Sequence, residues 1–220
     1  MEDLEQRFAV AQERLRRASL ALAPKHKGGE IEEFHAALSE VLSLERQLAA
    51  AKGEEYAETL NFPVKWDTGA PLPFLFMSDL KTFLTFYVSE PDPNWDGSYV
   101  TVKDPADKTV ESLAVVEFHR CSSAKMGTPN DEVFEGHPLN GKGLEAYTAQ
   151  VVRNSRWLAS LQAINSVHSQ YDPARWKDQK HFVFWFHDST FECVAESYKV
   201  ELFTGIMSEL LSEVSRRLVD

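Results

Sequence analysis

The sequence predicts an α+β fold, with a mostly antiparallel sheet, packed helices and an N-terminal helical hairpin. Three observations support this prediction. Apolar residues recur at helical spacing over residues 3–53. From residue 62 onward, short runs of β-forming residues alternate with Gly and Pro. The densest run, 181–187, is apolar on both faces, which is typical of a central strand. We therefore expect a coiled-coil-like hairpin over residues 1–60 and an α+β domain over residues 61–220.

The first helix of the expected hairpin carries a narrow apolar seam. Its spacings alternate between four and three residues, about 3.5 on average, as in a coiled coil. The seam consists of Leu4, Phe8, Ala11, Leu15, Ala18 and Leu22. Pro24 and Gly28-Gly29 then interrupt the pattern before a second apolar stripe begins at Ile31. Because such a hairpin buries little by itself, we expect it to self-associate or bind a partner protein; packing on its own domain is the alternative.

The remaining elements follow from local patterns. Strands are expected over residues 74–77, 81–88, 113–120, 145–153, 181–187 and 190–196. The segment 121–143 is rich in Gly and Pro, which predicts a long loop. Asn154-Ser155 predicts the start of a helix. An apolar face from Phe203 to Leu218 predicts a closing helix.

The chain is acidic, with a formal net charge of -11. Such a surface repels phosphate groups, so we expect no nucleic-acid binding and no membrane binding. The apolar runs are also too short to span a bilayer. Two cysteines, Cys121 and Cys193, cannot form a disulfide framework, and the acidic N-terminus lacks a signal-peptide pattern. We therefore expect a cytoplasmic protein.

The first candidate site is the cluster His187, Asp188 and Glu192, which follows the densest apolar run. An imidazole beside carboxylates can act as a general base, and His119 is a further candidate member of such a catalytic site. However, adjacent strand residues point to opposite faces, and Asp188-Ser189 is also typical turn chemistry. We favour the turn interpretation and lean away from an enzyme.

The second candidate site lies in the expected loop, where Asp131, Glu132 and His137 have ligand-binding chemistry. Their spacing matches no calcium or zinc motif, and the chain lacks nucleotide-binding motifs, so we expect no metal and no cofactor. Cys121 is a possible nucleophile, although an inert, half-buried thiol is the interpretation we favour.

Several motifs resemble a group of uncharacterised bacterial proteins: Gly136-His-Pro-Leu139, Gly143-Leu144 with Tyr147, Asn154-Ser155 with Trp157, and the run from His181 to Glu192. The likeness spans about residues 62–196 and leaves out the hairpin. It implies a bacterial, soluble setting but no activity. It also favours treating the 127–143 loop and the 187–192 turn as one feature.

The function we expect is that of a non-catalytic binding or interaction protein of the bacterial cytosol. A ligand or partner would bind between the 127–143 loop and the 187–192 turn. Two alternatives remain. One is a hydrolase-type enzyme that uses His187, Asp188 and Glu192. The other is an acidic inhibitor or immunity protein that covers a basic partner, as the net charge suggests.

Overall fold

The computed structural model describes residues 1–22, 28–89 and 103–219, and the chain forms two compact units. Unit 1 contains Met1–Glu58, Glu135–Glu145 and Val152–Arg156. Unit 2 contains Thr59–Phe134, Ala146–Val151 and Trp157–Asp220. The start of unit 2 lies close to the expected boundary at residue 61, while two later segments group with the hairpin. Helices and antiparallel sheets are both present, which confirms the α+β prediction.

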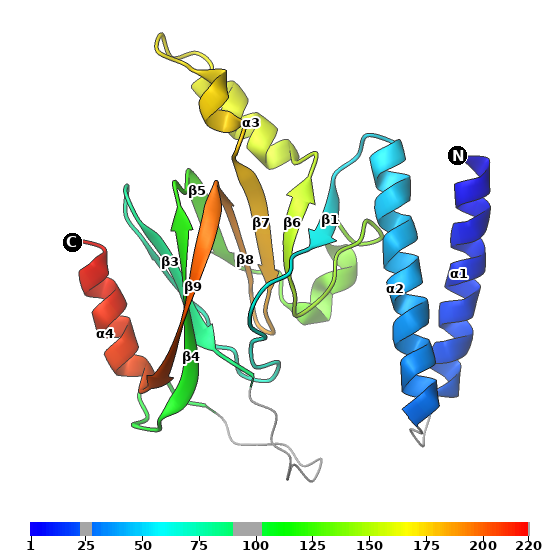
Figure 1. Cartoon of the computed structure of the whole chain (residues 1–220), viewed down its shortest axis with the longest axis horizontal. Coiled ribbons are helices and arrows are strands. Elements are labelled where there is room, and N and C mark those ends of the chain that lie inside the picture. The colour runs from blue at the N-terminus through cyan, green and yellow to red at the C-terminus, as the bar shows by residue number, and fades with distance from the viewer. Residues whose placement is uncertain (23–27, 90–102, 220) are drawn as a thin grey trace. The chain divides into compact units, whose positions relative to one another are not determined.

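Unit 1 is built on the N-terminal helical hairpin (Figure 1). Helix α1 spans Glu2–Ala21 and α2 spans Gly28–Ala51, and the short strand β1 follows at Tyr56–Thr59. The apolar seam of α1 lies against α2 of the same chain. The residues in this contact are Ala11, Val41 and Leu44, with Leu4, Phe8 and Leu15 around them.

The first sheet of unit 2 has the strand order β2-β3-β4-β9. These strands span Phe74–Met77, Thr82–Tyr87, Glu111–His119 and Ser197–Gly205. The predicted hairpin between the first two is present, with Met77 opposite Thr82. Helix α4, Met207–Arg217, packs on one face of this sheet through Met207, Leu210 and Val214.

The second sheet of unit 2 contains neighbouring strands in the order β6-β7-β8-β5. They span Ala149–Arg153, Lys180–Trp185, Thr190–Ala195 and Ser123–Gly127, and the last two residues of β6 group with unit 1. An aromatic core joins both sheets: Phe182, Phe184 and Phe186 meet Phe86 and Phe118. On the other face of β7, His181, Val183 and Trp185 are also buried. The prediction of a central strand covered on both sides is therefore confirmed.

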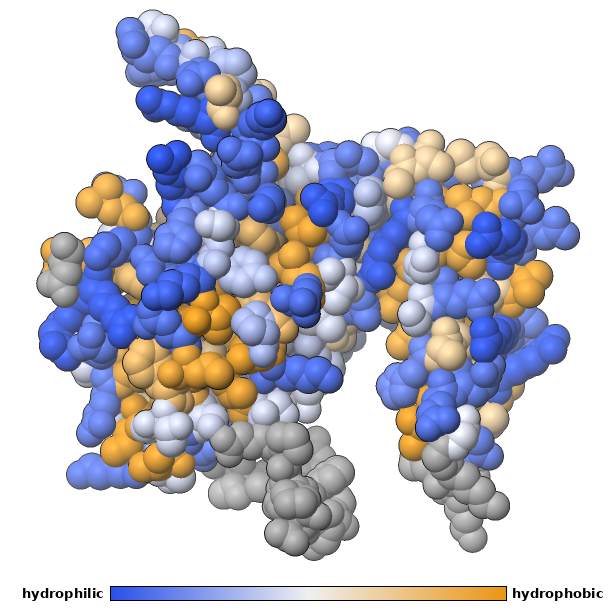
Figure 2. All heavy atoms as spheres, in the orientation of Figure 1, coloured by the Kyte–Doolittle hydropathy of each residue, from blue (hydrophilic) through white to orange (hydrophobic). Residues whose placement is uncertain are grey.

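The remaining elements of the chain are short. Two 3₁₀ helices, η1 and η2, span Asp131–Gly136 and Pro173–Trp176, and helix α3 spans Arg156–Asn165. Hydrophilic residues cover most of the visible surface of α3 and the segment after it (Figure 2). Within the described part of the chain, no helix is both long and apolar enough to cross a membrane.

Three expected elements need correction. Strand β5 lies inside the segment expected to be a loop, because Ser123–Gly127 pairs with β8. Strand β9 occupies the residues just before the closing helix, so Phe203 lies on a strand and the helix begins at Met207. The strand expected over residues 145–153 begins only at Ala149. In each case long-range pairing overrides the local pattern.

Candidate functional site

Three polar side chains of unit 2 meet around one carboxylate oxygen. The Tyr147 hydroxyl donates to Asp131 Oδ2 at 2.5 Å, and His187 Nδ1 lies 2.7 Å from the same oxygen. The Tyr147 oxygen is 3.5 Å from His187 Nδ1, so the three groups form a closed triangle. The side chains of His187 and Asp131 are 38% and 21% exposed, and Asp131 Oδ1 is buried, so the imidazole is the part of the cluster that a ligand can reach. We call these three residues the Asp–Tyr–His cluster.

The Asp–Tyr–His cluster is positioned by the turn between β7 and β8. The backbone N–H of Asp131 donates to the His187 carbonyl at 3.1 Å, which fixes the start of η1 against this turn. The Thr190 hydroxyl donates to the Pro129 carbonyl at 2.8 Å. The Phe134 ring packs edge-on against Trp185, with centroids 4.9 Å apart. These contacts join residues 129–134 of the expected 127–143 loop to the β7–β8 turn and the strands beside it.

Tyr147 enters the cluster from an unusual backbone conformation. Its φ is 57°, in the left-handed region that few residues other than glycine adopt. Next to it, the N–H of Trp185 donates to the carbonyl of Thr148 at 3.4 Å, which ties this segment to β7. Strained backbone is concentrated at functional sites, where surrounding contacts hold it in place. The conformation of Tyr147 therefore points to the cluster as a site.

The ionised state of Asp131 determines which atoms of the cluster carry hydrogen. Hydrogen bonds from Tyr147 and His187 hold the pKa of the Asp131 carboxyl below its ordinary value. Because the ionised carboxylate can only accept, His187 Nδ1 must carry the hydrogen. His187 therefore keeps Nε2 as its second functional nitrogen, an acceptor when the ring is neutral and a donor when it is protonated.

Two further carboxylates, those of Asp188 and Glu132, influence the pKa of His187. The hydrogen bond with Asp131 is the main reason that the pKa of His187 is raised, and the charges of Asp188 and Glu132 raise it further. Both Asp188 and Glu132 are exposed. The site is therefore one partly exposed imidazole among three carboxylates, and its local charge is negative even when the ring is protonated.

Glu192 belongs to a different network. Glu192 Oε2 lies 2.8 Å from His181 Nε2, and Glu192 Oε1 lies 2.8 Å from Lys125 Nζ. Trp157 completes the group, since Lys125 lies over its ring at 4.8 Å and His181 packs against its edge at 5.0 Å. The structure thus places Glu192 with His181, whereas it places His187 with Asp131.

The His181–Glu192 pair of this second network is buried, whereas Lys125 is 58% exposed. The His181 and Glu192 side chains are only 5% and 12% exposed. Burial alone raises the pKa of the Glu192 carboxyl, but the hydrogen bonds from His181 and Lys125 outweigh it and lower the pKa to about 2. A carboxylate that is so strongly paired stays ionised and is a poor proton acceptor at neutral pH. Its geometry fits a structural role.

The other candidate histidines have hydrogen-bond partners of their own. His119 is an exposed residue at the end of β4, and its carbonyl accepts the N–H of Glu196. His137 belongs to unit 1, where its Nδ1 accepts the N–H of Leu139 at 3.2 Å. Of the residues selected from the sequence, the structure therefore brings together Asp131 and His187, with the charges of Glu132 and Asp188 close by.

The sequence did not single out Tyr147 as a site residue. The sequence pattern places Tyr147 on a strand, and nothing in that pattern distinguishes its hydroxyl from the other polar groups of the chain. Nor did it single out His181 and Lys125. For His181 a signal existed, because hairpin register places Val183 opposite Glu192, which brings His181 within diagonal reach. For Tyr147 the signal is absent, since its role depends on a turn 40 positions later.

Neither the cluster nor any other group of three or more His, Cys, Asp or Glu residues in the described ranges is arranged to hold a metal ion. The residues of the cluster can hydrogen-bond and recognise charge, and His187 can transfer a proton. Comparison with known proteins adds no relative, because no family model, no curated protein and no solved structure matches this chain.

Proposed function

We propose that this is a non-catalytic binding protein, and that the Asp–Tyr–His cluster recognises a basic segment of a partner. The observation that carries the proposal is the meeting of Asp131, Tyr147 and His187, from three separate segments, at a partly exposed point. We also propose a bacterial, cytosolic setting, which the resemblance to bacterial proteins and the two free thiols support. An acidic inhibitor that covers a basic partner is one form of this function.

The charge around His187 selects the class of ligand. Asp131, Glu132 and Asp188 all act on the imidazole, so a Lys or Arg side chain gains favourable electrostatic energy there. Neutral His187 can accept a hydrogen bond from such a group through Nε2. The net charge of -11 steers basic partners toward the protein over longer distances.

A peptide titration tests this proposal. We would measure the fluorescence anisotropy of labelled oligolysine and oligoglutamate peptides in the presence of the protein. We expect the lysine peptide alone to bind. Asp131→Asn combined with Asp188→Asn should weaken that binding about tenfold, because two partly exposed ion pairs of roughly 0.7 kcal/mol each are lost. Asp104→Asn with Asp107→Asn removes the same charge elsewhere and should change the affinity less than about twofold.

The pH dependence gives an independent check. Protonation of His187 adds a positive charge beside a cationic ligand, so binding of the lysine peptide should weaken as the pH falls through the raised pKa of His187. His187→Gln keeps a hydrogen-bond acceptor without a titrating charge and should remove this dependence. Stronger binding at low pH, or equal loss in both charge-matched double variants, would contradict the proposal.

One observation favours the hydrolase alternative. Asp131 holds Nδ1 of His187, and this is how a carboxylate orients an imidazole that acts as a general base. Such an enzyme would use Asp131 rather than Glu192, which is hydrogen-bonded to His181. Hydrolysis of p-nitrophenyl acetate separates the cases. A hydrolase should lose its rate in His187→Ala and keep it in His119→Ala, which removes an exposed surface imidazole. Equal rates in all three proteins exclude it.

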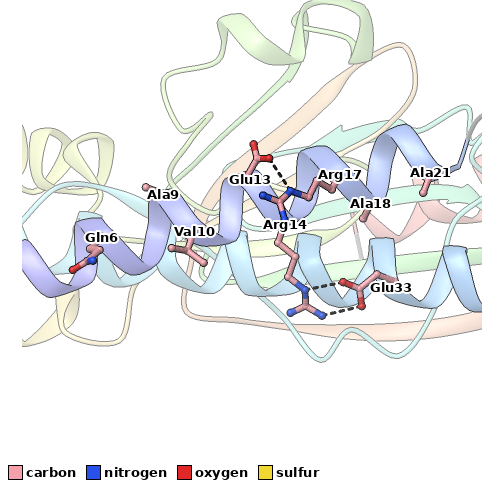
Figure 3. Close-up of a pocket in the computed structure, with 9 residues that line it drawn as sticks. All are labelled: Gln6, Ala9, Val10, Glu13, Arg14, Arg17, Ala18, Ala21 and Glu33. Atoms are coloured by element: carbon pink, nitrogen blue, oxygen red, sulfur yellow. Dashed lines mark hydrogen bonds and ion pairs between the residues drawn. The ribbon is translucent and has the colours of Figure 1, made fainter.

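We also propose that the hairpin is a self-association arm. Its seam already packs within the hairpin, so the available surface is a groove on α1, with a volume of about 710 Å³ (Figure 3). Its lining combines apolar residues with an ion pair between Arg14 and Glu33 at 2.7 Å. The apolar lining residues are Ala9, Val10, Ala18 and Ala21. Because this lining combines small apolar residues with charged ones, an amphipathic helix from a second copy is the occupant we propose.

Light scattering across a range of concentrations tests this arm. Val10 is 67% exposed, so Val10→Glu should lower the mass of an oligomer without unfolding the hairpin. Val167 is 89% exposed and lies in unit 2, so Val167→Glu is a matched control that should keep the parent mass. A parent protein that stays monomeric at every concentration contradicts self-association.

A further inference from the structure

Cys121 and Cys193 form a pair of interacting thiols in unit 2. Strand pairing brings their segments together, since Ala124 lies opposite Cys193 and the N–H of Ser122 donates to the Val194 carbonyl at 2.7 Å. Both cysteines contact the aromatic core between the two sheets. Both are free thiols, and Cys121 Sγ donates to the Ser123 carbonyl at 3.4 Å. The neighbouring Cys193 thiol is the largest cause of the lowered pKa of Cys121. The arrangement differs from that of an isolated inert thiol.

The two thiols differ in access. Cys193 is fully buried, with an exposed fraction of 0%. Cys121 is partly exposed and lines a polar cavity of about 580 Å³ together with Arg120, Ser122 and Gln179. The walls are held by hydrogen bonds, because the Gln179 amide donates to the Arg120 carbonyl at 3.1 Å and the Ser122 hydroxyl donates to Gln179 at 3.2 Å. A small solute can therefore reach Cys121 but not Cys193.

The two thiols also differ in pKa. The hydrogen bond from Cys193 lowers the pKa of the Cys121 thiol to about 7 although burial opposes this, and Thr82 contributes a second hydrogen bond. Burial raises the pKa of Cys193 well above its ordinary value. At neutral pH Cys121 is therefore present in large part as the reactive thiolate, while Cys193 keeps its proton.

We propose that Cys121 is a peroxide-reactive cysteine and that Cys193 is its resolving partner. In the first step the Cys121 thiolate attacks one peroxide oxygen. An S–O bond forms, the O–O bond breaks, and the departing hydroxide takes a proton to become water. Cys121 is then a sulfenic acid. In the second step the Cys193 sulfur, having lost its proton, attacks the Cys121 sulfur. The S–S bond forms, the S–O bond breaks, and a second water leaves.

This assignment replaces the inert thiol favoured from the sequence. One peroxide is reduced to two waters while two thiols are oxidised to one disulfide, so the electrons balance. A dithiol reductant restores both thiols by exchange. Because Cys193 is buried and its pKa is raised, the second step should be the slower one at neutral pH. The sulfenic acid should therefore exist long enough to be trapped.

Mass spectrometry of the full chain tests the proposal. The protein is treated with hydrogen peroxide, denatured, alkylated and digested. The parent should show a Cys121–Cys193 disulfide within one chain, reversed by dithiothreitol. With dimedone present during the peroxide treatment, Cys193→Ala should give a dimedone adduct at Cys121. In Cys121→Ser, Cys193 should stay a reduced thiol that is alkylated only after denaturation. Circular dichroism checks that both variants are folded.

A second measurement does not depend on variants. The rate of iodoacetamide alkylation of the native parent should rise with pH about a midpoint near 7, with modification at Cys121 alone. The proposal is overturned if both thiols stay free after peroxide treatment, if disulfides form only between chains, or if Cys193 is alkylated as fast as Cys121.

Discussion

At the scale of single residues, the bond between His187 and Asp131 makes a prediction about titration. The pKa of His187 should be above 6.5 in the folded protein, and Asp131→Asn should lower it, because the first cause of the increase is the hydrogen bond to Asp131. A pH titration of the imidazole by NMR measures both values. An unchanged His187 midpoint in Asp131→Asn would contradict the geometry of the cluster.

The sign of the stability effect follows from the same shifts. The raised pKa of His187 means that its contribution to folding is complete below 6.5 and is lost as the pH rises through the folded value. The lowered pKa of Asp131 means that its contribution is present above 3.8 and is lost as the pH falls. The pair therefore stabilises the fold most between these two values. His187 is 38% exposed, so solvent screens much of the effect.

Glu192 gives a larger prediction, because its carboxylate is buried beside His181, although Lys125 is 58% exposed. Glu192→Gln should lower the free energy of unfolding by about 2 kcal/mol at pH 7, since charged hydrogen bonds to His181 and Lys125 are lost. Glu196→Gln is a matched control. Its partner Arg120 is 77% exposed, so the cost should be about 0.5 kcal/mol. Urea denaturation measures both, and equal costs would show that the Glu192 network does not stabilise the fold.

At the scale of elements, Gly143 shows how tightly the segments of unit 1 approach one another. Its φ is +80°, and an added Cβ would lie 2.4 Å from Arg46 Cγ and 2.7 Å from the Ala57 carbonyl oxygen. Arg46 also donates to the carbonyls of Ala57 and Gly143. A methyl group therefore has to displace both a backbone and an anchored side chain.

We expect Gly143→Ala to lower the free energy of unfolding by about 3 kcal/mol, through strain and steric conflict together. Gly141→Ala separates the two causes, because Gly141 has a φ of +72° and nothing within 4 Å of the added Cβ. That control should cost only about 1 kcal/mol, from the backbone conformation alone. Thermal unfolding of both variants checks this. Equal losses would show that the close approach to Arg46 does not matter.

The elements also show what local sequence can predict. Periodicity identified α1, α2, β7 and β8, because each has a long or dense apolar pattern. Periodicity missed β5. This segment lies among glycines and prolines and has no apolar pattern, and it is a strand because it pairs with β8. For the candidate site the sequence identified Asp131 and His187 separately. It could not join them or add Tyr147, because these contacts arise only after β7 and β8 pair.

At the scale of the whole molecule, the net charge of -11 predicts behaviour toward polyanions. We expect no binding of duplex DNA or RNA at physiological salt, because each phosphate contact requires a nearby cation. An anisotropy titration with a labelled duplex checks this, and the lysine peptide described above is the positive control. Micromolar binding of the duplex would mean that a local basic surface overrides the overall charge.

The Asp–Tyr–His cluster also has a consequence for the order in which the chain is synthesised. Asp131 leaves the ribosome 56 positions before His187, and Tyr147 leaves 40 positions before it. The hydrogen bond between Asp131 and His187 therefore cannot form until β7 and β8 have been synthesised and have paired. A nascent chain that stalls earlier presents Asp131 but no assembled recognition point. A partner that requires the complete cluster would thus not bind incomplete chains. It would bind only chains in which the β7–β8 hairpin has formed.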